Sequence, residues 1–235
     1  MTPVPRVAVV AGSGLDLTGI LDQVRWEEPF DAFEGLSSTS VEGHTGSFTQ
    51  GTCGKIEVVV QQGRRHFYEG LTFGEVAAPV HVLAALGVQG VLFTNAAGGL
   101  RPEFEPGNLL AVERLRTWPY HGWLERPAEL VPDWVAPECD ATGAYMWVHG
   151  PSYETQAEIG CIQAMDVSAV GMSTAPELAA ALRLGMRTGA LSCITNNCCR
   201  ARKLTHHEVL TTAERASVKL CETLRRGLPD FAGAF

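Results

Sequence analysis

The sequence lacks any apolar run that approaches the roughly 20 residues a helix needs to cross a bilayer. Its first residues pass from Pro3 and Pro5 directly into a strand-like run at 7–10, which is not the pattern of a signal peptide. Basic residues are also few, with 18 Lys and Arg against 26 Asp and Glu and a formal net charge of −8. Non-specific nucleic-acid binding requires a basic surface, which this balance excludes. We therefore expect a soluble, cytoplasmic protein that binds neither membranes nor nucleic acid.

A disulfide framework and a zinc motif are missing as well. The seven cysteines are odd in number and irregularly spaced, which is typical of buried thiols in a reducing compartment. Cys198, Cys199, His206 and His207 are close in sequence, but their spacing matches no standard zinc pattern. We therefore expect neither a metal nor a cofactor.

The pattern of apolar runs predicts the fold class. With 235 residues and 46% hydrophobic composition, the chain can bury one large core. Strand-like runs alternate with helical patterns, which predicts an α/β fold: a single domain over 1–235 with a central mixed, largely parallel sheet flanked by helices. The predicted strands are 6–10, 56–61, a run that starts at 91, 109–115, 145–148, 169–174 and 188–195, and the predicted helices are 73–86, 155–165, 179–184 and 204–224.

Four further stretches carry weaker expectations. A helix is expected to start within 16–24, and 30–54 reads as hairpin-like or loop structure. Gly98 and Gly99 are expected to turn the backbone sharply where the strand from 91 ends. The segment 116–144 mixes aromatic residues with prolines and shows no steady period, so we expect a long excursion with little regular structure.

Small and polar residues follow several predicted strands, and ligands of open α/β sheets lie beyond the carboxyl ends of strands. The turn around Ser13 exposes backbone N–H groups that can hold a phosphate. A dinucleotide site, as in an NAD-dependent oxidoreductase, is the alternative, but the third glycine of that fingerprint is absent. Three polar residues follow the strand 56–61: Arg64 and His66 can donate hydrogen bonds, and Glu69 can accept them. Together they are suited to holding an oxyanion. We expect these loops to converge on one site.

Six motifs in this order resemble the trimeric class of purine nucleoside phosphorylases, a family related to the methylthioadenosine phosphorylases. Together they span nearly the whole chain, and the joint match is far more specific than any single motif. The motifs are Gly12-Ser13-Gly14-Leu15, Gly63-Arg64 with His66 and Tyr68-Glu69-Gly70, Thr94-Asn95-Ala96-Ala97-Gly98-Gly99-Leu100, Gly150-Pro151-Ser152-Tyr153-Glu154-Thr155, Gly171-Met172-Ser173-Thr174 with Pro176-Glu177, and Ile194-Thr195-Asn196.

The resemblance implies a role for each matching residue. It implies His66, Glu154 and Asn196 as catalytic residues, and inorganic phosphate as the co-substrate. The implied phosphate-binding residues are Ser13, Arg64, His66, Ala96 and Ser173, with His44 at the phosphate end. The implied ribose-binding residues are Tyr68, Met172 and His206. The implied purine-binding residues are Glu154, Asn196, Tyr153, Val170, Gly171 and Thr195, with Tyr145 beside them.

The resemblance also implies phosphorolysis of a nucleoside to the free base and ribose 1-phosphate. A neutral amide at Asn196 suits 6-oxopurines, because adenosine-type members of the family carry a carboxylate there, so inosine and guanosine are the expected substrates. A methylthioadenosine-type phosphorylase and a nucleoside-binding homologue with little or no turnover are the alternatives. The interval 101–144, between Leu100 and Tyr145, is atypically short for the family and lacks the family's usual Asp-His-Ile-Asn sequence.

The family further implies a homotrimer in which this interval lends an aromatic residue to the neighbouring subunit's site. The candidates in this chain are Phe104, Trp118, Tyr120, Trp123 and Trp134.

Overall fold

The computed structural model describes residues 6–37, 46–117, 129–200 and 206–233, without the side chain of His206, and the counts below refer to this part of the chain. Its strands are β1 (Arg6–Val10), β2 (Gln23–Pro29), β3 (Ser47–Cys53), β4 (Ile56–Gln62), β5 (Gly90–Gly99), β6 (Leu109–Thr117), β7 (Glu129–Leu130), β8 (Ala141–Trp147), β9 (Ala169–Gly171) and β10 (Arg187–Asn197). Its α-helices are α1 (Phe73–Ala85), α2 (Gln156–Gln163), α3 (Ala175–Arg183) and α4 (His206–Ala232). Short 3₁₀ helices lie at Thr18–Ile20, Phe30–Ala32 and Phe67–Glu69.

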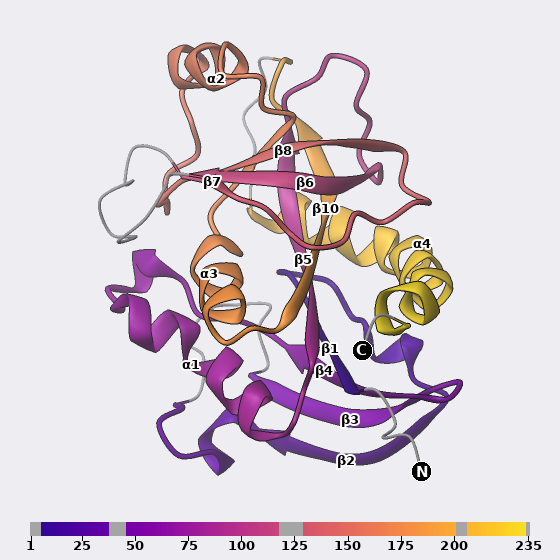
Figure 1. Cartoon of the computed structure of the whole chain (residues 1–235). Helices are drawn as coiled ribbons and strands as arrows, with labels where there is room; N and C mark the ends of the chain where they lie inside the picture. Colours follow the sequence, from indigo (N-terminus) through magenta and orange to yellow (C-terminus); the bar gives the residue numbers. More distant parts are fainter. Residues whose placement is uncertain (1–5, 38–45, 118–128, 201–205, 234–235) are drawn as a thin grey trace.

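Strand β5 lies at the centre of one mixed sheet. It pairs in parallel with β1 and β10, and its last residues pair antiparallel with β9. From β5 the sheet continues through β1, β4, β3 and β2 on one side. On the other side the pairings β10–β6, β6–β8 and β8–β9 lead back to β5, so five strands form a closed circuit. Figure 1 shows this circuit in the upper part of the molecule and the extended sheet below it.

The helices cover the two faces of the sheet. Helices α1 and α3 lie on one side and α4 on the other (Figure 1). Leu83 of α1 and Leu178 of α3 are fully buried with Phe93 of β5 in one core cluster, whereas Leu220 of α4 is buried with Val9 of β1 in a second. The predicted mixed α/β fold with flanking helices is confirmed, and parallel and antiparallel strand pairings are equally frequent.

Two expectations about the first quarter of the chain need correction. No long helix starts within 16–24; this stretch forms the short 3₁₀ helix Thr18–Ile20 and then enters β2. The carboxylate Oδ1 of Asp16 accepts hydrogen bonds from the backbone N and the Oγ1 of Thr18, at 2.9 and 2.7 Å, and such local side-chain bonds favour a turn over a helix. Strand β3 lies within 30–54 and forms a hairpin with β4, so the hairpin reading is confirmed and the loop reading is wrong there.

The expected sharp turn at Gly98 and Gly99 is also wrong, because both glycines lie within β5. They permit close packing instead. A Cβ atom added to Gly98 would lie 2.5 Å from Cys198 Sγ, and one added to Gly99 would lie 2.9 Å from Ile194 Cγ2. The absence of side chains therefore lets β10 and the residues after it approach β5 at the edge where the cavity described below lies.

The segment 116–144 is partly regular. Strand β6 continues to Thr117, β7 pairs with it at Glu129–Leu130, and β8 begins at Ala141, while 118–128 lies outside the described residues. Phe104 and Trp134 are only 3% and 7% exposed. Trp134 Nε1 donates to Asp230 Oδ2 at 2.6 Å, which anchors it within its own subunit. These two aromatic residues are therefore unsuited to reach a neighbouring subunit, and the other three candidates, Trp118, Tyr120 and Trp123, lie outside the described residues.

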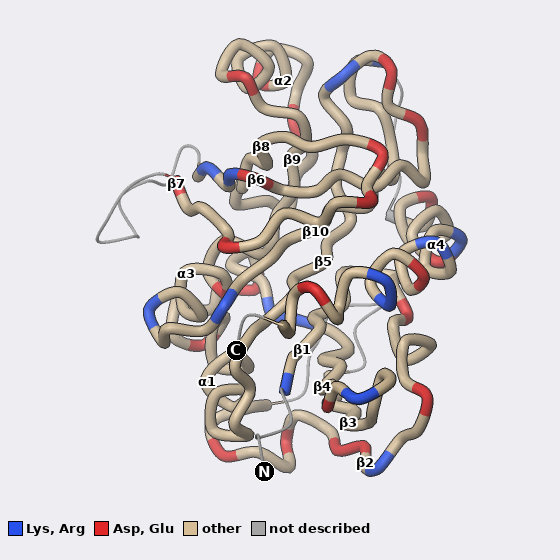
Figure 2. The backbone as a smooth tube through the Cα atoms, turned by 45° about the vertical axis from the view of Figure 1, so that its right-hand side comes forward, with Lys and Arg blue, Asp and Glu red and all other residues tan. Residues whose placement is uncertain are grey.

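The surface carries both signs of charge. Figure 2 shows Lys and Arg distributed among Asp and Glu, and several of the cations form ion pairs, such as Lys219 with Asp140 at 2.6 Å and Arg116 with Glu129 at 2.7 Å. None of the helices in the described part of the chain is both long enough and apolar enough to span a membrane. All seven cysteines are free thiols, but the expectation that they are buried holds only for Cys53 and Cys193, since Cys161 is exposed and the other four are partly buried.

Candidate active site

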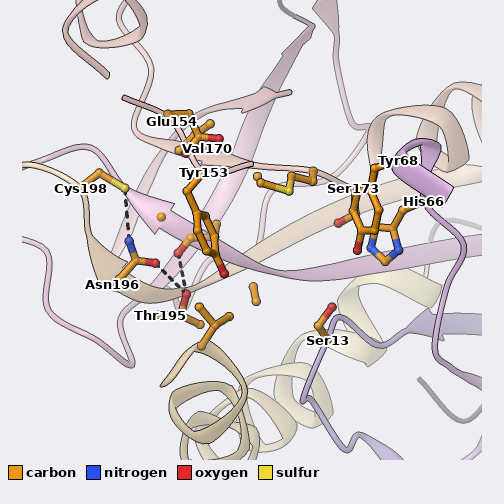
Figure 3. A pocket seen from close by; sticks show the side chains of 16 residues that line it. Ser13, His66, Tyr68, Tyr153, Glu154, Val170, Ser173, Thr195, Asn196 and Cys198 are labelled. Carbon is orange, nitrogen blue, oxygen red and sulfur yellow. Dashed lines mark hydrogen bonds between the residues drawn. The ribbon is translucent and has the colours of Figure 1, made fainter. Parts of the chain in front are cut away.

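A cavity opens where the carboxyl ends of several strands meet, and most of the predicted site residues line it. In Figure 3 one end is formed by Ser13, His66, Tyr68 and Ser173, and the other by Glu154, Val170, Thr195, Asn196 and Cys198. Ala96, Gly171, Met172 and Tyr153 also line it. A second cavity of about 690 Å³ adjoins the Asn196 end and shares Tyr153, Glu154, Thr195, Asn196 and Cys198 with the first. The loops that the sequence predicted to converge therefore do so.

The turn after β1 brings Ser13 to the cavity. Gly14 adopts a positive φ of 71°, and Leu15 N donates to Gly12 O at 3.1 Å, which closes the turn. Gly12 N donates to Thr94 Oγ1 of β5 at 3.2 Å. A Cβ atom on Gly12 would lie 2.7 Å from the Asn95 Cα, so glycine is required for this contact. The turn is thereby held directly against the β5 backbone that leads to Ala96.

His66 and Tyr68 come from the loop after β4. Glu69 Oε1 accepts a hydrogen bond from His66 N at 2.6 Å and lies 3.4 Å from His66 Nδ1, so this carboxylate orients the imidazole. The rings of His66 and Tyr68 stack with centroids 4.7 Å apart and an interplanar angle of 15°. Burial and the nearby Glu69 raise the pKa of Tyr68 to about 12, so its phenol keeps its proton near neutral pH and remains a hydrogen-bond donor.

Arg64 lies behind the cavity wall. Its side chain is fully buried, and Nη1 donates to Ser173 Oγ at 2.8 Å and to Thr174 Oγ1 at 3.0 Å. Its Nε lies 3.5 Å from Glu177 Oε2, and both side chains of this ion pair are only 1% exposed. The guanidinium therefore does not line the cavity itself but contacts Ser173, which does.

Glu154 and Asn196 lie together at the other end of the cavity. Burial raises the pKa of Glu154, and the nearby Glu158 acts in the same direction. Asn196 Oδ1 accepts from Thr195 Oγ1 at 3.1 Å, and its Nδ2 donates to Cys198 Sγ at 3.3 Å (Figure 3). The side-chain amide thus has a defined orientation, with an unused N–H and an unused lone pair available to a ligand.

Tyr145 supports this wall from behind. Its hydroxyl donates to the Ser173 carbonyl oxygen at 3.2 Å, and burial raises the pKa of the phenol. A Cβ atom on Gly171 would lie 2.5 Å from that hydroxyl oxygen, so a glycine is needed between Val170 and Met172.

Cys198 is a lining residue that the sequence analysis did not assign to the site. Burial raises the pKa of its thiol to about 12, with Glu154 adding to the effect, so the group is a neutral thiol. Cys198 lies in the turn after β10, two residues beyond Asn196, so its closeness in sequence to a predicted site residue is the signal that would have found it. His44 and the side chain of His206 lie outside the described residues, so their predicted places are not compared.

Metal ligands do not gather in the part of the chain that the structure describes, where no three His, Cys, Asp or Glu side chains form a group that could hold an ion. The polar groups of the cavity are instead hydroxyl, imidazole, amide and carboxylate. Such a set can bind an anion at the Ser13 end and a hydrogen-bonding planar ring at the Asn196 end.

A family model and curated proteins show what the chain is similar to. The model of the "Phosphorylase superfamily" matches residues 6–132 and 138–228. Purine nucleoside phosphorylase 1 of Geobacillus stearothermophilus is 35% identical over 90% of this chain and 86% of its own length. Purine nucleoside phosphorylase of Bos taurus is 31% identical over 92% of this chain and 86% of its own length.

Solved structures give the same result. A purine nucleoside phosphorylase from Schistosoma, determined in complex with hypoxanthine, superposes with a TM-score of 0.81 at 28% identity and covers 97% of this chain and 91% of its own. A Schistosoma mansoni purine nucleoside phosphorylase in complex with adenosine gives the same TM-score at 27% identity, with the same coverage of both chains. The chain therefore belongs to the phosphorylase superfamily and, within it, to the purine nucleoside phosphorylases.

Proposed function

We propose that this chain cleaves 6-oxopurine ribonucleosides, inosine and guanosine, with inorganic phosphate to give the free base and ribose 1-phosphate. The observation that carries this proposal is the placement of the neutral amide of Asn196 beside the carboxylate of Glu154, in one cavity with Ser13, His66 and Ser173. Family membership supports purine nucleoside phosphorolysis, and the amide at residue 196 supports the preference for a 6-oxo group.

The anion end accounts for phosphate attack. As the glycosidic bond breaks, the sugar develops oxocarbenium character, and a phosphate oxygen attacks the anomeric carbon. Hydroxyl and imidazole donors from Ser13, Ser173 and His66 would hold the phosphate in place, and its negative charge would stabilise the cationic sugar. Tyr68, at the anion end, and Met172 line the same cavity and would contact the ribose.

The base end accounts for departure of the purine, which gains electrons as the bond breaks. The remaining amide N–H of Asn196 would donate to the 6-oxo group or to N7, and Glu154 would accept from N1–H. No protein group has to form a covalent intermediate in this scheme, and no cofactor is needed. We also propose a homotrimer, on the resemblance to the trimeric class, and a cytoplasmic location, on the composition.

The experiment is an inosine assay with and without inorganic phosphate, repeated with guanosine, adenosine and methylthioadenosine. We expect phosphate-dependent release of hypoxanthine from inosine and of guanine from guanosine, with far slower release from the two adenine nucleosides. Comparable rates with adenosine would refute the 6-oxopurine preference. Binding of inosine by calorimetry without any release would favour a nucleoside-binding homologue without turnover.

A pH profile tests the role of Glu154. The ionised carboxylate is the form that accepts from N1–H, and a raised pKa means that Glu154 takes up its proton at a higher pH than an ordinary glutamate. We therefore expect kcat/KM for inosine to fall on the acid side at pH values above the ordinary glutamate range. In Glu158→Gln the midpoint should move to lower pH, because a like charge near Glu154 is removed. An acid limb within the ordinary glutamate range would contradict this role.

A further inference from the structure

We propose that Thr174 and Asn95 are positioning residues that turn the hydroxyl proton of Ser173 into the cavity, where it donates to phosphate. This inference rests on the proposed function, because it concerns the phosphate co-substrate. Thr174 and Asn95 are only 0% and 1% exposed. Neither lines the cavity, so both act through Ser173 and Arg64.

Thr174 holds an uncommon backbone conformation. Its φ is +80° and its ψ is −44°, a region that residues with a branched Cβ rarely adopt. Such conformations persist only where surrounding contacts enforce them, and they cluster at functional sites. Here Thr174 N donates to Glu177 Oε2 at 3.2 Å, and Glu177 also pairs with Arg64. The contacts that hold Thr174 are thus the same ones that hold the guanidinium.

The direction of each hydrogen bond follows from the number of lone pairs and protons that each hydroxyl has. Thr174 Oγ1 lies 3.0 Å from Arg64 Nη1 and 3.0 Å from Asn95 Nδ2, and both of these nitrogens can only donate. A hydroxyl has two lone pairs and one proton, so both lone pairs of Thr174 are taken. Its proton must point to another acceptor, and Ser173 Oγ lies 3.4 Å away.

The same count then applies to Ser173. Ser173 Oγ accepts from Arg64 Nη1 at 2.8 Å and from the Thr174 hydroxyl. These two hydrogen bonds occupy both lone pairs of Ser173 Oγ. The Ser173 proton is left for an acceptor outside this group, and Ser173 lines the cavity. An anion that enters the cavity therefore meets a hydroxyl already committed to donating, which avoids reorganisation on binding.

The test compares Thr174→Val, which removes the hydroxyl at constant shape, with Thr174→Ser, which keeps it. We expect Thr174→Val to raise KM for phosphate by about tenfold, equivalent to one hydrogen bond to a charged group, with KM for inosine changed less than about twofold. Thr174→Ser should stay close to wild type. Asn95→Leu should raise KM for phosphate in the same direction, which gives a second variant if Thr174→Val does not fold.

Thr188→Val is the matched control. Thr188 is another fully buried threonine, its hydroxyl bonds Asp133 at 2.9 Å, and it lies at the far end of β10 from Asn196. We expect this control to lower thermal stability without changing KM for phosphate. Equal changes of both KM values in Thr174→Val would indicate a merely structural role and overturn the inference, as would an unchanged KM for phosphate.

A titration with inorganic phosphate alone, followed by thermal stabilisation, separates the inference from the proposed function. Wild type should be stabilised by phosphate, and Thr174→Val should need about tenfold more phosphate for the same shift. If wild type binds phosphate but releases no base from nucleosides, the proposed function fails while the titration still decides the inference. If Thr174→Val and wild type bind phosphate equally well, the inference fails whatever the activity.

Discussion

Replacing Arg64 with methionine is expected to abolish measurable phosphorolysis and to lower the free energy of unfolding by about 3–5 kcal/mol. The activity is lost because Arg64 holds Ser173 and supplies the positive charge at the anion end of the cavity. The stability is lost because Glu177, only 1% exposed, would keep a buried charge without its partner. Urea unfolding and an inosine assay with saturating phosphate measure the two effects.

The double variant Arg64→Met/Glu177→Gln distinguishes the two effects. Because it removes both charges of the buried pair, it should recover most of the lost free energy of unfolding, while the activity should stay absent. Arg116→Met is the surface control, since Arg116 pairs with Glu129 at about one-third exposure and should contribute far less to stability. If Arg64→Met is as stable as wild type, the prediction is contradicted, because Glu177 would then not be a buried charge without a partner in that variant.

Replacing Asn196 with aspartate should lower kcat/KM for inosine by about 10²–10³-fold and raise the ratio of adenosine to inosine turnover. The two side chains have nearly the same shape, but the carboxylate cannot donate. It would face the 6-oxo group with a negative charge while the purine itself gains electrons, whereas it could accept from a 6-amino group. The amide now donates to Cys198 Sγ at 3.3 Å, and that contact would be lost too.

Initial rates with inosine and adenosine at fixed phosphate check this second prediction. Asn108→Asp is the control, because Asn108 Oδ1 accepts from Glu105 N at 2.8 Å, a bond that a carboxylate can keep. We expect that control to behave like wild type with both nucleosides. An unchanged preference for inosine in Asn196→Asp would show that another group selects the base.

Local sequence signals predicted most of the regular elements, because they depend on residues close together in the chain. Helix α1 begins after Thr72, whose side chain accepts from Glu75 N at 3.3 Å, and ends before Gly87, whose φ is +79°. Helix α2 begins in the same way after Thr155. The positions of Ser13, His66, Glu154 and Asn196 after or at the ends of strands were readable for the same reason.

The failures came where distant segments decide the local structure. Gly98 and Gly99 were predicted to form a turn, yet they lie in β5. The residues there are glycines because β10 and Cys198 pack too closely against them for a side chain. The segment 16–24 read as a helix start, but its pairing with β3, far along the chain, makes its end an edge strand. Phe104 and Trp134 were candidates to reach a neighbouring subunit's site, and only the packed core shows them buried.

The sequence by itself determined the alternation of strands and helices, the capped helix ends and the set of chemical groups available to the site, since each of these follows from neighbouring residues. The tertiary structure alone decided that Arg64 lies behind Ser173 and that Thr174 accepts hydrogen bonds from both Arg64 and Asn95. The physical reason is that hydrogen-bond direction and burial depend on atoms brought together from segments 79 to 110 residues apart, and no local pattern specifies them.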